Sequence, residues 1–280
     1  MSEARSRTLI SVAGLADLLA GGGPVVLLDV LDEKGAAPTD RPRIPGALSV
    51  HLATDFSGKP TKTSGKRPLP GIMDLQADAR RWGISPGSTV VVYDNTGGAQ
   101  ASRAWWTLRW AGFPHVRILD GGFAAWKSSG RPVSHAHVEA ADKAGVVVLT
   151  SGHMPTLTAG QAAALACEGF LLDARGRAAY LGEPGKAGTG HIPGALSAPS
   201  GDHLTPEGAF HPHDDLCACF ASLGLDGAER IGVYCGSGNA AAHAIAALSA
   251  AGREASLYVG SWTAWTTDPS RPAATGPERG

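Results

Sequence analysis

One stretch decides the fold: Ile231-Gly232-Val233-Tyr234-Cys235-Gly236-Ser237-Gly238-Asn239-Ala240, with an alanine-rich run to Ala250 behind it. The first four residues are apolar and partly β-branched, which is typical of a short buried parallel strand. The run from Ala240 to Ala250 has helix-forming composition, and Gly252 is suited to end it. The pattern predicts a strand, a tight glycine-rich loop that opens with a cysteine, and a helix.

The same pattern occurs earlier in the chain, which indicates a duplicated domain. Val90-Val91-Val92-Tyr93-Asp94 precedes a loop with two glycines and a helical run that ends at Ala111-Gly112. Self-similarity of this kind is the signature of an internal repeat. Three further pairs occur in the same order: Val25-Val26-Leu27-Leu28-Asp29-Val30 with Phe170-Leu171-Leu172-Asp173-Ala174-Arg175, Ile44-Pro45-Gly46-Ala47-Leu48 with Ile192-Pro193-Gly194-Ala195-Leu196, and Gly121-Gly122-Phe123-Ala124-Ala125-Trp126 with Gly260-Ser261-Trp262-Thr263-Ala264-Trp265.

Strands that alternate with helices place each copy in the α/β class. We expect a mostly parallel sheet in each copy, with helices on both faces. The first copy should span residues 1–130 and the second 156–280, joined by a polar linker at 131–155. Within that linker, Val146-Val147-Val148-Leu149 could add a strand that docks one copy on the other.

Composition excludes several classes of partner and compartment. Lys+Arg (24) and Asp+Glu (25) nearly cancel, which argues against nucleic acid and against an acidic membrane surface. No apolar run reaches the length of a secretory signal core or a membrane span. The four cysteines show no spaced disulfide framework, so we expect a cytoplasmic protein.

The chemistry is expected at the loop that opens with Cys235, because open α/β sheets bind ligands beyond the carboxyl ends of their strands. Gly236 and Gly238 allow the backbone N–H groups of the loop to point inward and form an anion-binding nest. The positive end of the helix that begins near Ala240 adds to this effect. Both features favour a thiolate over a thiol. The competing interpretation, a small buried hydrophobic cysteine, explains less, because the first copy keeps the loop and carries Asp94 instead.

These features together carry a family resemblance. Tandem copies with a cysteine only in the second, the element His191-Ile192-Pro193-Gly194-Ala195, and the strand–cysteine–loop–helix ending resemble the two-domain rhodanese and mercaptopyruvate sulfurtransferase family. The resemblance extends from about Thr8 to Pro272. It implies that Cys235 takes sulfur from a small donor, thiosulfate or 3-mercaptopyruvate, and holds it as a persulfide. Cyanide, a thiol or a protein cysteine then accepts the sulfur. The resemblance implies no cofactor and no metal.

The substrate assignment is less direct. The Cys-Gly-Ser-Gly loop is similar to the mercaptopyruvate branch, but two arginines that grip the donor carboxylate there fall on Ala179 and near Lys186. An Asp and a His that work with the loop serine in that branch fall near Ala53 and Arg67, so only Ser237 of that trio remains. A shorter donor, thiosulfate, or a different acceptor becomes more plausible. The candidate anion contacts are Arg177, Lys186 and Arg67.

Two other functions compete with sulfur transfer. Cysteine phosphatases use a similar loop but need an arginine six residues after the cysteine, where this chain has Ala241, and the loop is one residue shorter than in rhodanese-like phosphatases. A sulfur-carrying or regulatory binding module with little catalysis would fit the missing arginines. The retained Cys235 and its intact loop, Gly236, Ser237, Gly238, Asn239 and Ala240, argue against it.

Nearby polar residues are expected to be structural. Asp173 and Arg175 should form a buried ion pair that ties the strand to the loop. His191 corresponds to Arg43 in the copy without a nucleophile, which favours a structural role. The C-x-C spacing of Cys217 and Cys219 is not that of a structural zinc site.

Overall fold

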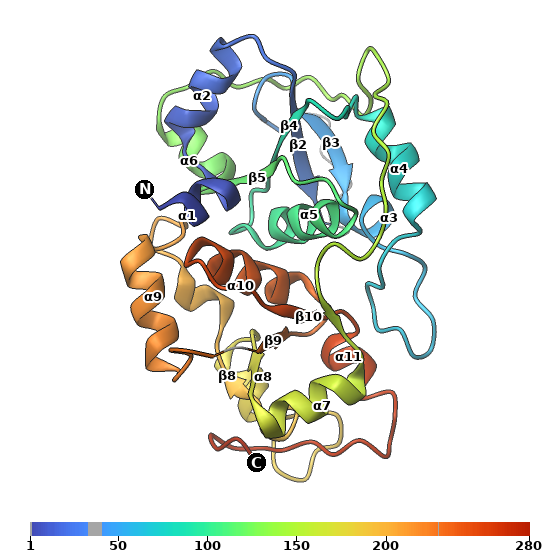
Figure 1. Cartoon of the computed structure of the whole chain (residues 1–280), viewed down its shortest axis with the longest axis vertical. Coiled ribbons are helices and arrows are strands. Elements are labelled where there is room, and N and C mark those ends of the chain that lie inside the picture. Colours follow the sequence, from blue (N-terminus) through green and yellow to red (C-terminus); the bar gives the residue numbers. More distant parts are fainter. Residues whose placement is uncertain (1, 33–40, 229) are drawn as a thin grey trace. The chain divides into compact units, whose positions relative to one another are not determined.

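The computed structural model describes residues 2–32, 41–228 and 230–280, and they form two compact units (Figure 1). The first unit consists of Met1–Gly58, Leu69–Met154 and Thr205–Phe210, and the second of Lys59–Pro68, Pro155–Leu204 and His211–Gly280. This division differs from two continuous copies at 1–130 and 156–280, and nearly all of the expected linker at 131–155 belongs to the first unit.

Two short exchanged segments belong to the unit formed mainly by the other copy. Lys59–Pro68 of the first copy is part of the second unit, and Thr205–Phe210 of the second copy is part of the first unit. Phe210 N–H donates to the Asp120 carboxylate at 2.8 Å within the first unit. Lys66 N–H donates to the Thr263 hydroxyl at 3.2 Å within the second.

Each unit contains a five-stranded, fully parallel sheet, and the strand order is the same in both: β1-β5-β4-β2-β3 and β6-β10-β9-β7-β8. This identity confirms the duplication and the α/β class. The strands of the first sheet are β1 (Leu9–Ile10), β2 (Val25–Leu31), β3 (Leu48–His51), β4 (Thr89–Tyr93) and β5 (Val116–Leu119). Those of the second are β6 (Thr156–Leu157), β7 (Phe170–Asp173), β8 (Leu196–Ser197), β9 (Ile231–Tyr234) and β10 (Ser256–Tyr258).

The predicted helices after the two central strands are present, and Gly112 and Gly252 follow their ends in the left-handed conformation expected of a terminating glycine. In the first unit the helices are α1 (Glu3–Thr8), α2 (Val12–Ala20), α3 (Leu52–Asp55), α4 (Ile72–Arg81), α5 (Ala99–Trp110) and α6 (Gly122–Ser128). In the second they are α7 (Ala159–Glu168), α8 (Arg177–Leu181), the short 3₁₀ helix η1 (Ser200–His203), α9 (His213–Ser222), α10 (Asn239–Ala250) and α11 (Ser261–Trp265).

Helices cover both faces of the sheets, as expected for parallel strands. On one face of the first sheet, Tyr93 of β4 packs with Leu15 of α2 and Trp126 of α6. Contacts of α5 with β2, β4 and β5 bury the opposite face. In the second sheet, Tyr234 of β9 packs with Ala166 of α7, and α10 contacts β9 and β10. The cysteine loop therefore begins at the end of a strand that is buried on both sides.

The prediction of a strand at Val146–Leu149 is wrong. The segment is extended, but it joins no sheet and packs on the first unit, where Val147 N–H donates to the Ile84 carbonyl at 3.2 Å. Its side chains alternate between buried and exposed, with Val147 at 3% and Val148 at 72% exposure. The exposure of the side chains alternates as in a strand, although the segment pairs with no strand. Its hydrogen-bond partners are the end of α4 and the residues after it.

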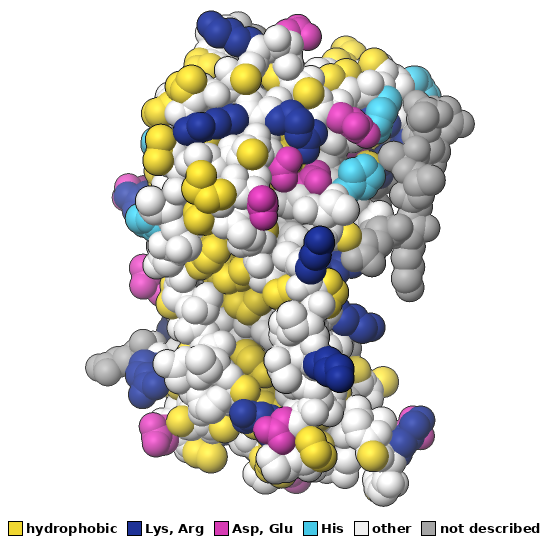
Figure 2. All heavy atoms as spheres, turned by 90° about the vertical axis from the view of Figure 1, so that its right-hand side faces the viewer, with side chains coloured by type: hydrophobic (Ala, Val, Ile, Leu, Met, Phe, Trp, Pro, Cys, Tyr) yellow, Lys and Arg dark blue, Asp and Glu magenta, His cyan; other side chains and the backbone are white. Residues whose placement is uncertain are grey.

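Charged side chains of both signs are interspersed over the face shown in Figure 2, in keeping with the nearly neutral composition. Among the described residues, no helix has the length and apolar character needed to cross a membrane.

The repeated Ile-Pro-Gly-Ala-Leu element allows a matched stability test. Gly46 and Gly194 both have positive φ, 78° and 87°, so alanine at either site costs about 1–2 kcal/mol. A Cβ on Gly46 meets nothing, whereas one on Gly194 lies 2.5 Å from the Ala166 carbonyl oxygen. We expect Gly194→Ala to destabilise its unit by about 1–3 kcal/mol more than Gly46→Ala does, because the backbone must also shift. Hydrogen exchange of the β9 and β4 amides measures each unit separately, and equal losses would contradict the prediction.

Candidate active site

Cys235 is the first residue after β9, and its side chain lies at the centre of the predicted loop. Gly238 has φ of 96° and precedes the first turn of α10. Its N–H donates to the Cys235 sulfur at 3.1 Å. Cys235 is only 2% exposed, whereas Gly236, Ser237, Asn239 and Ala240 are partly exposed. The thiol thus lies at the positive end of a helix, on a backbone that is open to a ligand from the loop side.

The corresponding loop of the first unit binds a carboxylate. The Asp94 carboxylate accepts four backbone N–H groups, from Thr96 (2.9 Å), Gly98 (2.8 Å), Gln100 (3.0 Å) and Ala101 (2.9 Å). Gly98, with φ of 88°, precedes α5 as Gly238 precedes α10. The loop is therefore an anion cradle, and in the first unit a carboxylate of the chain itself fills it.

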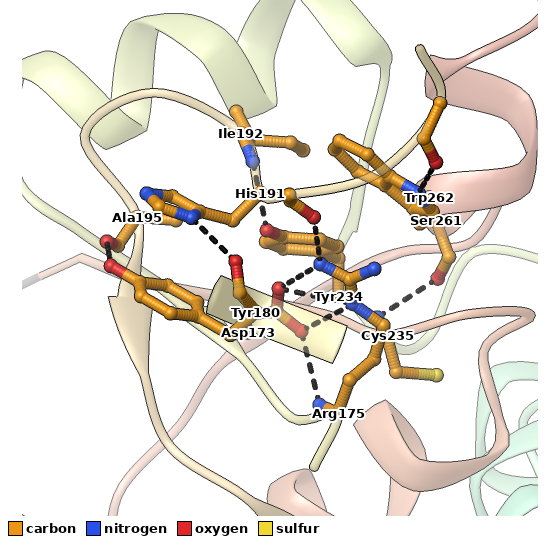
Figure 3. Close-up of polar contacts among 12 residues, drawn as sticks. Asp173, Arg175, Tyr180, His191, Ile192, Ala195, Tyr234, Cys235, Ser261 and Trp262 are labelled. Carbon is orange, nitrogen blue, oxygen red and sulfur yellow. Dashed lines mark hydrogen bonds and ion pairs between the residues drawn. The ribbon is translucent and has the colours of Figure 1, made fainter. Parts of the chain in front are cut away.

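The turn into α11 holds the backbone of the cysteine. Trp262 N–H donates to the Cys235 carbonyl at 2.8 Å, and Thr263 N–H donates to the Gly236 carbonyl at 3.2 Å. Cys235 N–H in turn donates to the Ser261 hydroxyl at 3.2 Å (Figure 3). These contacts fix the direction of the peptide groups on which the cradle depends.

Sequence reasoning missed Ser261. In the first unit the equivalent of the Trp262 bond runs from Phe123 N–H to the Asp94 carbonyl, at 3.1 Å. The residue that corresponds to Ser261 is Gly122, and a Cβ added to it would lie 2.7 Å from the Asp94 carbonyl oxygen. Ser261 is the only described residue other than glycine with positive φ, at 53°. Strained backbone of this kind is concentrated at functional sites. The replacement of Gly-Gly-Phe by Gly-Ser-Trp in the second copy was the available signal.

The expected ion pair between Asp173 and Arg175 is confirmed. Arg175 Nε and Nη2 donate to both oxygens of the buried Asp173 carboxylate at 2.5–3.1 Å, and Nη2 also donates to the Gly190 carbonyl at 2.6 Å. Its guanidinium lies 4.6 Å from the centre of the Trp262 ring. Burial lowers the pKa of Arg175, but the bonds to Asp173 outweigh burial and the pKa is raised. The pair thus joins the end of β7 to the α11 turn (Figure 3).

A second tie fixes the strand just before the cysteine. The hydroxyl of Tyr234 accepts Ile192 N–H at 3.0 Å, as the hydroxyl of Tyr93 accepts Ile44 N–H at 3.1 Å in the first unit. Burial raises the pKa of both phenols, so they stay neutral. His191 stacks on the Tyr180 ring and hydrogen-bonds the Tyr180 carbonyl through Nδ1 at 2.8 Å, which is the structural role expected for it.

The three candidate anion contacts differ in their surroundings. Arg177 is exposed at the first residue of α8. Lys186 pairs with Glu183 at 2.7 Å on the surface. Arg67 is half-buried and belongs to the exchanged segment Lys59–Pro68, which packs on the α11 turn through Gly65 and through the bond from Lys66 to Thr263. Of the three candidates, Arg67 is the one whose neighbour in the chain, Lys66, is hydrogen-bonded to the α11 turn that holds Cys235.

Within the described parts of the chain, no cluster of three or more His, Cys, Asp or Glu side chains could hold a metal ion. His213 does contact Cys217, with 3.7 Å between Nε2 and Sγ.

Comparison with known proteins identifies the class that this fold and loop define. The sequence model of the Rhodanese-like domain matches residues 11–129 and again 158–268. The chain belongs to the two-domain rhodanese and mercaptopyruvate sulfurtransferase family.

Individual relatives agree with this assignment. SseB of Mycobacterium tuberculosis, named as a candidate thiosulfate sulfurtransferase, is 43% identical over 98% of this chain and 99% of its own length. A Pseudomonas aeruginosa protein named as a candidate 3-mercaptopyruvate sulfurtransferase is 39% identical over 86% of this chain and 87% of its own. The crystal structure of YnjE, 24% identical, has the same fold, with a TM-score of 0.82 over 97% of this chain and 69% of its own.

The self-filled cradle of the first unit leads to a stability prediction. Asp94→Ala leaves the four amide groups without their anion, and we expect a loss of about 2–4 kcal/mol in that unit. Sulfate should restore part of this loss by occupying the cradle, while the wild type gains little. Thermal unfolding with and without sulfate measures both effects. Asp142→Ala, at an exposed carboxylate of the same unit, is the control, and equal effects of the two variants would refute the prediction.

Proposed function

We propose that Cys235 is the sulfur-carrying nucleophile of this sulfurtransferase and that thiosulfate is its preferred donor. One observation carries the proposal: the loop that binds a carboxylate through four N–H groups in the first unit holds a thiol at the corresponding position in the second. The cradle stabilises the negative charge that a thiolate or a persulfide needs.

The reaction consists of two displacements. The Cys235 thiolate attacks the outer sulfur of thiosulfate, forming a new S–S bond. The original S–S bond breaks, and its electron pair leaves with sulfite. An acceptor nucleophile, either cyanide or a thiolate, then attacks the outer sulfur of the persulfide. It leaves with that sulfur, and the electron pair of the broken bond regenerates the Cys235 thiolate in the amide cradle. No other oxidant or reductant is needed.

The preference for thiosulfate rests on the groups around the loop. A 3-mercaptopyruvate donor needs a cationic grip on its carboxylate, and the two positions that would supply it hold Ala179 and the surface residue Lys186, which is paired with Glu183. A compact dianion needs only the N–H groups of the loop and one nearby cation. Arg67 is the best placed of the three candidates, because its segment is attached to the α11 turn.

The acceptor and the compartment are part of the same proposal. The partly exposed loop residues leave room for cyanide, a small thiol or a protein cysteine. All four cysteines are free, which fits a reducing cytoplasm. The competing role, a sulfur carrier with little turnover, would load Cys235 but release its sulfur slowly.

The test combines steady-state turnover with intact mass. Wild type treated with thiosulfate should gain the mass of one sulfur atom and transfer it to cyanide in repeated turnovers. Cys235→Ser should do neither, because the hydroxyl cannot form the persulfide. Cys167→Ser, at an exposed cysteine of the same unit, is the control and should behave as wild type. Loading without turnover would support the carrier role, and persulfide on Cys235→Ser would refute the proposal.

The role of Arg67 is tested by charge removal. Arg67→Gln should raise the KM for thiosulfate by roughly tenfold, the effect of losing one charge-assisted hydrogen bond. Arg177→Gln, at an exposed arginine of the same unit, should change it less than about twofold. The proposal for Arg67 fails if both variants have the same KM.

A further inference from the structure

The first unit contains a cavity that the sulfur chemistry does not use. It has a volume of about 460 Å³ and lies at the amino ends of the strands, since Thr89 opens β4 and Arg117 lies near the start of β5. The Asp94 loop follows the carboxyl end of β4, so the two features lie at opposite ends of the same strand. The residues that line the cavity are Ser6, Arg7, Thr89, Arg109, Pro114, His115 and Arg117.

The lining is cationic. It contains three arginines and a histidine but no carboxylate. Arg7 pairs with the exposed Glu3 on α1. Arg109 is positioned by Trp105, whose ring centre lies 5.7 Å from the guanidinium carbon. Arg117 is half-buried and forms no ion pair with a carboxylate of the described chain, and burial lowers its pKa. Like charges gathered around one hollow repel each other, and a bound anion removes that repulsion.

The fold itself does not require Arg109 or Arg117. The second unit builds the same helix end and the same strand with serines: Ser249 corresponds to Arg109, three residues before the terminating glycine, and Ser256 to Arg117 in the strand register. The cationic lining is therefore a property of the copy that lacks the nucleophile.

We propose that this cavity binds an organic phosphate with at least two negative charges, of the size of a nucleoside diphosphate. Guanidinium groups match phosphate oxygens in a bidentate geometry, and a diphosphate brings several such oxygens and at least two negative charges to the three arginines. The pocket is open to solvent, and its volume lies in the range of small-molecule sites and exceeds that of a single inorganic anion. The exposed ring of His115 offers a flat surface beside the arginines for a base or sugar.

Calorimetric titration of the full chain with metal-free ADP tests the proposal, with inorganic phosphate and sulfate as separate probes. We expect saturable ADP binding at submillimolar concentration, at least about tenfold tighter than either inorganic anion. Arg117→Gln and Arg109→Gln should each weaken ADP binding by about tenfold or more. Lys127→Gln removes one exposed positive charge of the same unit outside the cavity and should leave it unchanged. On wild type, ADP should slow hydrogen exchange at residues 114–119 but not at 236–239.

Three results would overturn the assignment. The first is the lack of both heat and exchange protection with ADP at about ten millimolar. The second is ADP binding that neither arginine variant weakens. The third is binding of inorganic phosphate or sulfate as tight as that of ADP, which would reduce the cavity to a simple anion site.

Discussion

In each sheet, backbone N–H groups of the loop after the central strand point at the side chain of the first loop residue. The rest of the site depends on the hydrogen bonds that these N–H groups donate. Amide dipoles that converge at the positive end of a helix leave an uncompensated charge unless an anion occupies the centre. The first unit supplies that anion permanently, as the Asp94 carboxylate with four hydrogen bonds. The second unit places a cysteine there, so the side chain carries a negative charge only when its sulfur is ionised.

The elements around the loop serve to hold that geometry. The N–H of Trp262 and that of its counterpart Phe123 each bind the carbonyl of the residue that follows the central strand, and a buried tyrosine hydroxyl ties each strand to the Ile-Pro-Gly-Ala-Leu element. The two units differ where the occupant differs. The Asp94 carboxylate holds its loop through four hydrogen bonds, whereas the Cys235 sulfur accepts a hydrogen bond from Gly238 N–H in the described structure. The Ser261 hydroxyl accepts a hydrogen bond from Cys235 N–H and so holds the backbone of the cysteine loop. Ser261 itself has a strained backbone with positive φ.

Most of the fold and the centre of the site could be predicted from the sequence because their signals are local. Strand length, helix-forming composition and terminating glycines identified β4, β9, α5 and α10, and the repeat then related the two copies. The exchanged segments at 59–68 and 205–210 could not be found this way, because their contacts join residues far apart in the chain. The apolar run at 146–149 predicted a strand because it is β-branched, but the segment packs beside α4 and joins no sheet. Ser261 was missed because its positive φ and its bond from Cys235 N–H exist only in the folded backbone, and the sequence marks the position only by a serine in place of Gly122.

The permanence of the Asp94 carboxylate also limits what the first unit can do. A donor anion entering that cradle would have to displace a covalently attached group that already satisfies four amides, and the carboxylate would remain beside it as a like charge. The Asp94 carboxylate therefore disfavours the binding of an anionic donor at this loop. Any ligand chemistry of the first unit must use other surfaces, and the end of the sheet opposite the loop is free of this restriction. The second unit has serines at the positions of Arg109 and Arg117, so these two arginines of the first unit's cavity are better explained by binding than by folding.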